Sequence, residues 1–469
     1  MNPTAILPNW CRLALLVVAL AVVALLLTRC SLGRAEYHRR IAALRAAGEP
    51  ITATDFAARY PDPPPERDFR RLLRLALPAG SDPAAAPPLG DVWTAFAKVR
   101  AQSNREPLYP DLLDQVRCEL LASAATVELL LRTDLADFGL LHEWQDNGGF
   151  AYSGYRDGER VSMRINLCLA LALQAAYEAE VGHPQHAATA LVRGFQIAHL
   201  PSHAPQLSRV EVFGDCEAIM LTAVKRMLNR AKLTDDDLRY LGEALHRPSD
   251  FLRESVLSQR VSQLSLWDDP VWACYVHPLG FPKWYDVRFN VYKMGCRLRG
   301  YDGRLQLLDR WADRVAATRL PMREQLAAIA TIESKESQFK ASQTNFASRV
   351  RKCWDVDYSL FLESYLDLAN LFNVNAVELA RLANAQAAVA IERWRLEHPG
   401  RLPDTLAELV PAYLNAVPLD PFDGQPVRYK KLPVGYVVYC LGLDFTDNGG
   451  REGEQFRQPG FDTTLIVEW

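Results

Sequence analysis

The sequence has no excess of basic residues, because 53 lysines and arginines stand against 56 aspartates and glutamates, for a formal net charge of −3. Proteins that bind nucleic acid through its phosphates need a positive surface, so nucleic acid is not an expected partner. Hydrophobic residues make up 49% of the chain and charged residues 23%, which excludes the composition of a disordered protein. A length of 469 residues predicts about two or three folded domains.

Paired cysteine motifs are also missing, since nine cysteines are scattered without a CxxC. We expect most of them to be small buried hydrophobic residues. Such usage is slightly more typical of a reducing compartment, although free cysteines also occur in bacterial envelopes. A thiol and base pair at Cys274 and His277 is disfavoured, because neither their spacing nor a third orienting group would bring them together. Nothing else in the sequence identifies a catalytic reaction.

One long apolar run is present, LALLVVALAVVALLL at residues 13–27. A membrane-spanning helix needs roughly 17 to 25 apolar residues, and the flanking residues bring the run close to that length. A soluble helix without a polar face over this distance is unusual. We therefore predict a transmembrane anchor over residues 1–33, with a cleaved secretory signal as the alternative.

The charges that flank this run point toward a cytoplasmic body. One arginine precedes the run and five follow it: Arg12, then Arg29, Arg34, Arg39, Arg40 and Arg45. By the positive-inside rule alone, the large part of the chain would stay in the cytoplasm.

The rest of the chain divides into three predicted segments. Residues 34–91 form a membrane-proximal arm with a stiff proline-rich spacer, PDPPP at 61–65. Residues 92–375 have helical spacing, as at 112–132 and at 162–182, where the pattern breaks at Gly182-His183-Pro184 before an antiparallel partner helix. No period near 34 residues recurs, so a helical bundle or solenoid-like body is favoured over a tetratricopeptide array. Thr234 and Asp237 predict a capping box.

Residues 376–469 change character and predict a small α+β unit with a short antiparallel sheet. A helix at 376–400 precedes a short segment that Asp404 can cap. PVRYKK, GYVVYCLG and TTLIVEW have strand patterns, and Asp423-Gly424 supplies a turn before the first. The predicted fold class is therefore mainly α, with a transmembrane helix, a large helical body and this C-terminal unit.

An acidic, glycine-containing loop, LGLDFTDNGGREG at 441–453, follows the second predicted strand. Calcium takes six to eight oxygen ligands, and these side chains with loop carbonyls can supply them: Asp444, Asp447, Asn448 and Asp462. The spacing is not that of an EF-hand. A Ca²⁺ ion bound here is expected to be structural, because no nucleophile or base is close in the sequence. The alternative is a polar turn with Gly449 and Gly450 at positive φ.

Two other groups of residues invite a functional interpretation. Histidines with spacings of three and four suggest zinc, but prolines 184 and 201 interrupt a shared helical face, so loop-end histidines are favoured: His183, His186, His199 and His203. The aromatic, proline-interrupted segment 267–303 suggests a pocket or an irregular connection that buries its own rings. Its carboxylates suggest a glycosidase pair, but ordinary solvated acids are favoured: Asp268, Asp269, Asp286 and Asp302.

The order of LEHPGRLPDTLAELVP, DPFDGQPVRY and GYVVYCLGLDFTDNGG resembles the C-terminal part of pseudopilin G, the major pseudopilin of type II secretion. That family holds calcium in the acidic loop, which implies Asp444, Asp447 and Asp462 as ligands here. The start MNPTAILPNWCR lacks the family's leader-peptidase site. A role as an assembled pilus subunit is therefore not expected.

The remaining chain resembles uncharacterised, membrane-anchored helical proteins of bacterial envelopes. The resemblance lies in IAALRAAGEPITATDFAARYPDPPPERD and LCLALALQAAYEAEVGHPQHAATALVRGFQIA, besides LPDTLAELVP. It implies a single-pass protein of the cytoplasmic membrane with its bulk outside the cytoplasm. This outweighs the flanking arginines, because long domains translocate largely regardless of nearby charge.

These observations predict a non-catalytic binding or scaffolding protein of the cell envelope, with the lipid bilayer and another envelope protein as partners. Two alternatives stay open. One is an envelope hydrolase that acts on a saccharide or peptide in the 267–303 region. The other is an accessory component of a type II secretion or pilus-like apparatus.

Overall fold

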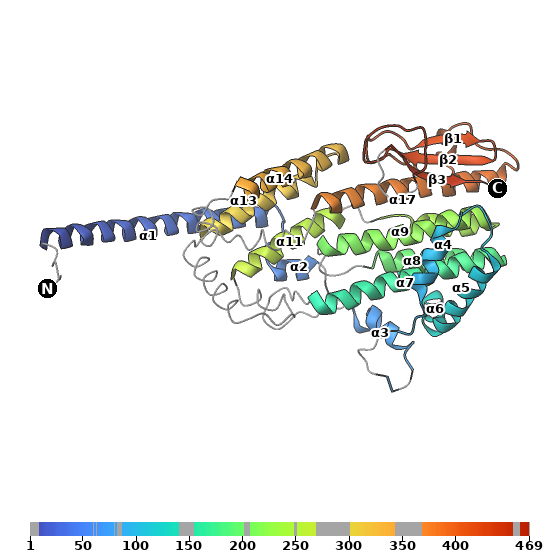
Figure 1. Ribbon diagram of the computed structural model, residues 1–469, viewed down its shortest axis with the longest axis horizontal. Helices are drawn as coiled ribbons and strands as arrows, with labels where there is room; N and C mark the ends of the chain where they lie inside the picture. Colours follow the sequence, from blue (N-terminus) through green and yellow to red (C-terminus); the bar gives the residue numbers. More distant parts are fainter. Residues whose placement is uncertain are drawn as a thin grey trace, which may run out of the picture.

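The computed structural model describes residues 9–59, 61, 63–78, 80–81, 87–139, 154–200, 207–247, 251–268, 301–342, 368–453 and 460–468. As predicted, the fold is mainly helical with one small antiparallel sheet near the C-terminus (Figure 1). The helical elements are α1 (Asn9–Ala46), α2 (Ala53–Arg59), η1 (Pro65–Arg67), α3 (Phe69–Arg74), α4 (Val92–Ala101), α5 (Pro110–Ala122), α6 (Ala124–Arg132), α7 (Gly154–Val181), α8 (Pro184–Ala198), α9 (Leu207–Arg230), α10 (Asp235–Ala244), α11 (Phe251–Asp268), α13 (Tyr301–Ala317), α14 (Met322–Ser342), α17 (Leu368–Glu397) and η3 (Leu406–Leu409).

The first helix, α1, is continuous over 38 residues and crosses the predicted boundary between residues 33 and 34. Its C-terminal part packs against α13, whereas its N-terminal part projects away from the body (Figure 1). In the part of the chain that the structure describes, no helix is both long enough and apolar enough to cross a membrane.

The main core is built on the hairpin of α7 and α8, with α9 and α17 packed beside it. The predicted break at residues 182–184 is confirmed. Gly182 has φ +86°, and the backbone N–H of His183 donates to the carbonyl of Glu178 at 2.9 Å, which is a Schellman cap. Pro184 then begins α8, where its missing N–H costs nothing. The small side chains at the crossing are buried, as expected: Ala187, Ala188 and Ala190.

Two local predictions have different outcomes. The capping box of Thr234 and Asp237 is present at the start of α10. The pattern at 112–132, in contrast, is divided into α5 and α6 at Ser123, whose hydroxyl donates to the carbonyl of Glu119 and accepts from the N–H of Gly90. A serine that bonds to backbone in this way competes with continuation of the helix.

The three strands are β1 (Arg428–Leu432), β2 (Gly435–Cys440) and β3 (Thr463–Val467), in the order β1-β2-β3 and all antiparallel, as predicted. One face of β2 joins the main core through Tyr436, Val438 and Cys440. The sheet docks on α17 and α9, and the predicted boundary between residues 375 and 376 lies inside α17. Helical body and sheet therefore share one hydrophobic core.

A second hydrophobic cluster lies where α1 meets the body. It joins the end of α1 and α2 to α11, α13 and α14, and its buried side chains include Ile41, Phe56 and Trp311. Glu49 follows α1 and is only 7% exposed. Its carboxylate forms ion pairs with Arg260 at 2.6 Å, Arg319 at 3.1 Å and Arg253 at 3.5 Å. The first part of the predicted arm is thus packed into the body.

The short segment after α17 differs from its prediction in one detail. The N-cap of η3 is Thr405, and the carboxylate of Glu408 accepts from the N–H groups of Asp404 and Thr405. Asp404 instead pairs with Lys431 on β1 at 2.5 Å. A threonine with glutamate three residues later satisfies two helix-start donors at once, which a lone aspartate does not.

Candidate functional site

The acidic loop predicted to hold calcium folds around its own backbone N–H groups. Asp444 Oδ1 accepts from Thr446 at 3.0 Å and its Oδ2 from Gly460 at 2.8 Å. Asp462 accepts from Asn448 at 3.2 Å and from Gly450 at 2.7 Å. Burial acts to raise the pKa of Asp444, but the hydrogen bonds from these backbone donors outweigh it and lower that pKa. The Asp444 carboxylate therefore stays ionised by accepting protein donors.

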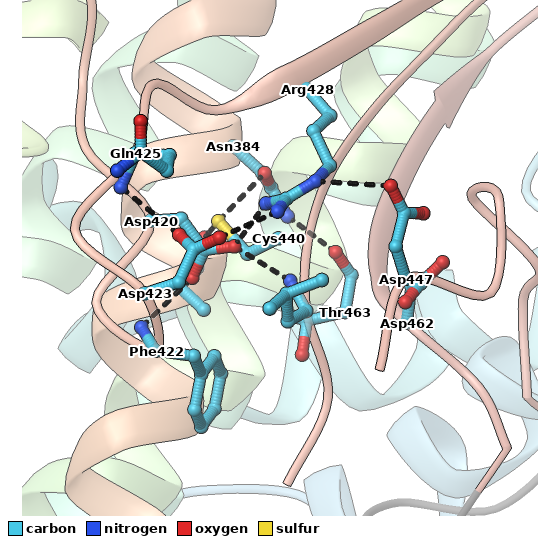
Figure 2. A network of polar contacts seen from close by, with 12 residues as sticks. Asn384, Asp420, Phe422, Asp423, Gln425, Arg428, Cys440, Asp447, Asp462 and Thr463 are labelled. Atoms are coloured by element: carbon cyan, nitrogen blue, oxygen red, sulfur yellow. Dashed lines mark hydrogen bonds and ion pairs between the residues drawn. The ribbon is translucent and has the colours of Figure 1, made fainter. Parts of the chain in front are cut away.

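Asp447 pairs with Arg428, as Figure 2 shows. Its Oδ2 lies 3.3 Å from Arg428 Nε, and its Oδ1 accepts from the N–H of Gly449 at 2.8 Å. Burial acts to raise the pKa of Asp447, and the Gly449 donor and the Arg428 charge lower it overall. The contacts of Asp447 are thus with Arg428 and with the backbone of its own turn.

The fit to a calcium ion follows from this geometry. Asn448 Nδ2 lies 3.4 Å from Asp444 Oδ2, so Asp444, Asn448 and Asp462 share one hydrogen-bonded network. In the described residues, the three aspartates do not form a group whose ligand oxygens all lie within 4.8 Å of one another. Calcium stays a prediction, and the hydrogen bonds account for the loop without it.

The loop has a clear structural role, because it covers the outer face of the sheet. Gly449 and Gly450 have φ +76° and +80°, as the polar-turn alternative expected. A Cβ at Gly450 would lie 3.1 Å from the Tyr439 ring and 3.4 Å from Val437. Lys430 donates to the carbonyl of Gly449 at 2.9 Å. The two glycines thus let the backbone approach an apolar face that would otherwise be exposed.

A buried charge network lies at the root of the same loop (Figure 2). Asp420 is fully buried, and its carboxylate accepts from Leu441 N–H at 2.7 Å, Phe422 N–H at 2.9 Å and Arg428 Nη1 at 2.7 Å. Burial raises the pKa of Asp420, and the two backbone donors oppose that shift. Arg428 also binds Asp423 at 2.6 Å. One guanidinium therefore ties together the turn before β1 and the loop after β2.

Cys440, beside this network, is not a reactive thiol. Burial raises its pKa well above the ordinary value, and its Sγ contacts the carbonyl of Ala380 and the Asn384 side chain. Asn384 in turn donates to the carbonyl of Thr463 at 2.7 Å (Figure 2). These contacts dock the sheet on α17, in keeping with a cysteine that acts as a small buried side chain.

A second buried polar cluster lies between α8, α9 and α17, and sequence reasoning missed it. Glu217 on α9 is fully buried and lies 2.9 Å from His199 Nε2 and 3.7 Å from Arg247. Glu378 on α17 is 1% exposed and pairs with Arg381 at 3.0 Å. Among the described residues, Oε2 of each glutamate accepts no hydrogen bond. A signal was present, because Glu378 interrupts the apolar pattern of its helix.

The pKa of Glu378 gives this cluster a measurable pH dependence. Burial raises that pKa to about 7, opposed by the Arg381 charge and reinforced by Glu217. A carboxyl whose pKa is raised in the folded state contributes stability below its unfolded pKa, near 4.5, and loses it as pH rises through about 7.

We therefore expect Glu378→Gln to be more stable than the wild type at pH 8, by about 2–3 kcal/mol, and the difference to shrink toward pH 4.5. Chemical unfolding across this range measures it. The exposed helix residue Glu128→Gln is the control and should show no such pH-dependent gain. Parallel pH profiles for Glu378→Gln and the wild type would contradict the assignment.

The other predicted site residues have mixed outcomes. His183 and His186 are neighbours, with ring centroids 5.7 Å apart, so the interrupting proline does not separate them. His199 instead joins the buried cluster at Glu217. His203, Cys274 and His277 lie outside the described residues, as does most of the aromatic 267–303 segment with Asp269 and Asp286. Asp268 ends α11, and Asp302 lies in the first turn of α13.

A shallow surface hollow lies where α4 ends near β3, with Ser103, Asn104 and Ile466 among its lining residues. Its charged side chains pair with one another: Arg105 lies 3.2 Å from Glu468, and Lys225 pairs with Glu452. These ion pairs join the helical body to the sheet, and we assign no ligand to the hollow.

Comparison with known proteins finds no matching family model, no matching curated protein and no matching solved structure. The resemblances to pseudopilin G and to membrane-anchored envelope proteins therefore stay expectations from the sequence. Function has to be argued from the chain itself.

Proposed function

We propose that the chain is a membrane-anchored, non-catalytic binding or scaffolding protein of the bacterial cell envelope. The observation that most supports this is the projecting part of α1 (Figure 1). Three of its apolar side chains, Val17, Val18 and Leu20, are 58–61% exposed and belong to the run 13–27. Contiguous apolar surface of this kind is unfavourable in water, and lipid would cover it.

The dimensions of α1 support a bilayer as the cover. At 1.5 Å per residue, residues 10–30 extend about 30 Å, which matches the hydrocarbon thickness of a membrane. Arg12 and Arg29 lie near the two ends of this stretch.

The junction between α1 and the body supports a scaffolding role. Ile41 of α1 is buried in the second cluster, and Glu49 binds three arginines from α11 and beyond. A rigid junction of this kind would hold the helical body at a fixed place beside the lipid. There, outside the cytoplasm, it would present its surface to another envelope protein. An accessory role in a type II secretion or pilus-like apparatus is one form of this function.

Membrane attachment is tested by placing charge in the run. Each aspartate at the centre of a spanning helix costs about 2.5–3.5 kcal/mol, so Val18→Asp with Leu20→Asp should release the full-length chain from bacterial membranes. The readout is flotation of membranes on a density gradient after a carbonate wash. The matched control is Leu32→Asp, because Leu32 is 67% exposed on the same helix but beyond the run.

The wild type and the Leu32→Asp variant should float with the membranes, whereas the double variant should not. A wild-type chain that is freely dissolved without detergent, with its N-terminus intact, would overturn the proposal. Protease treatment of intact and lysed spheroplasts then reports the side of the membrane. Digestion of the body in intact spheroplasts is expected, and protection until lysis would overturn the extracytoplasmic placement.

A further inference from the structure

The turn between α7 and α8 brings a carboxylate and two imidazoles together. Among the described residues, Glu178, His183 and His186 form the group of metal-ligating side chains whose ligand atoms all lie within 4.8 Å of one another. His183 Nδ1 lies 2.8 Å and His186 Nδ1 3.8 Å from the same atom, Glu178 Oε2. The two ring centroids are 5.7 Å apart.

The local fold dictates this convergence. The Schellman cap at Gly182 turns the chain back over the last turn of α7, so the residue after the glycine lies above Glu178. Pro184 starts α8 at once, and His186 falls in its first turn. The C-terminus of α7 and the N-terminus of α8 meet here, so the opposite charges of the two helix dipoles largely cancel. The three side chains therefore determine which ion the turn can bind.

The Glu178 carboxylate is oriented by a hydrogen bond from its own helix. Gln174, one turn earlier on α7, donates from Nε2 to Glu178 Oε1 at 2.7 Å. That bond fixes the carboxylate and leaves Oε2 to face both histidines. The Glu178 side chain is only 12% exposed, whereas His183 and His186 are 60% and 68% exposed. A half-buried, oriented carboxylate beside two exposed imidazoles is an arrangement in which an outer hydrogen bond positions a metal ligand.

The distances suit a small transition-metal ion. Zinc binds imidazole nitrogen and carboxylate oxygen at about 2.0–2.2 Å in tetrahedral geometry, which sets neighbouring ligand atoms about 3.3 Å apart. The two nitrogen–oxygen distances of 2.8 and 3.8 Å bracket that value. Two imidazoles and one carboxylate favour zinc, copper, nickel or cobalt over calcium or magnesium, which prefer oxygen ligands alone.

We propose that Glu178, His183 and His186 form a binding site for a divalent transition-metal ion of the zinc class. The site has three protein ligands and an open position toward solvent. A bound ion links the end of α7 to the start of α8, two helices of the main core, and so stabilises the body. Each imidazole binds the ion through a lone pair that protons also take, so affinity falls at acidic pH. This site is independent of membrane attachment by α1.

The test is zinc binding to the purified, chelator-stripped full chain in a mild detergent, followed by calorimetry and by melting temperature with and without zinc. The decisive variant is His186→Ala, because His186 is well exposed and its replacement should leave the metal-free melting temperature unchanged. His183→Ala and Glu178→Gln remove the other ligands. The matched control is His246→Ala, an exposed histidine after α10 that lies outside the group.

We expect the wild type and His246→Ala to bind one zinc ion in this site and to melt at a higher temperature with zinc. His186→Ala and His183→Ala should lose at least tenfold in affinity and the zinc-dependent increase in melting temperature. Equal affinity in the wild type and His186→Ala would overturn the proposal, as would a zinc-dependent melting increase that persists in both histidine variants.

Discussion

Replacement of Glu49 by alanine is expected to lower the free energy of unfolding by about 3–5 kcal/mol. Glu49 is 7% exposed and is surrounded by the guanidinium groups of Arg253, Arg260 and Arg319. Arg260 is itself 1% exposed, and besides Glu49 it donates to the carbonyl of Pro50 at 2.9 Å. The alanine variant would leave its positive charge buried without a counter-ion, and that desolvated charge is the main cost.

We expect Glu49→Ala to loosen the junction between α1 and the body before the whole chain unfolds. Without Glu49, the second hydrophobic cluster, which joins α1 to α11 and α13, loses the ion pair between Glu49 and Arg260 beside it. Trypsin should then cleave more readily after Arg45, at the end of α1, in protein purified in a mild detergent. Urea unfolding measures the global effect. A useful comparison is Arg260→Met, which removes the buried positive charge of Arg260 and leaves Glu49 paired with Arg253 and Arg319. This variant should lose less stability than Glu49→Ala.

The control is another ion pair between α1 and the body. Arg40 pairs with Asp309 on α13, but these side chains are 38% and 62% exposed. Solvent screens such a pair, so Asp309→Ala should change the free energy of unfolding by no more than about 0.5 kcal/mol. If Glu49→Ala and Asp309→Ala unfold at the same urea concentration, the buried network does not hold α1 to the body.

Local patterns in the sequence predicted local structure well. The apolar run GYVVYC predicted β2, Asp423-Gly424 predicted the turn before β1, and Gly182-His183-Pro184 predicted the break between α7 and α8. In each case the deciding interactions join residues a few positions apart, so the pattern contains them. Thr405 and Asp404 show the limit, because either of two adjacent residues can cap, and the Asp404 carboxylate pairs instead with Lys431 on β1.

The buried charges were not predictable in the same way. Glu49 lies in Gly-Glu-Pro, which by itself is typical of an exposed turn, and its partners are more than 200 residues away in sequence. Glu217 and Glu378 likewise meet only because α9 and α17 pack together. The histidine pair lies at the end of the α7–α8 hairpin, as was favoured from the sequence, but the closeness of the two rings was not foreseen. A shared helical face was required of it, whereas a Schellman turn brings the same side chains together without one.

The last prediction concerns Asp420, whose replacement by alanine should cost about 3–4 kcal/mol. Its carboxylate accepts three donors at 2.7–2.9 Å, and two of them are backbone N–H groups of Leu441 and Phe422. Alanine would leave both N–H groups without an acceptor beside a core that water does not reach. Arg428 would still pair with Asp423 and Asp447, so its charge stays compensated. The lost stability therefore comes mainly from the two backbone N–H groups that have no acceptor.

The location of that loss makes the prediction specific. Leu441 immediately follows β2, where the acidic loop begins, so its amide should lose protection from hydrogen exchange in Asp420→Ala well before the amides of α7 and α8 do. Asp404→Asn is the control, because Asp404 also pairs with a β1 cation, Lys431, but is 84% exposed. It should leave both the unfolding midpoint and the exchange pattern unchanged. Equal protection of Leu441 in Asp420→Ala and the wild type would mean that the loop is held by its own turns and not by the buried carboxylate at its root.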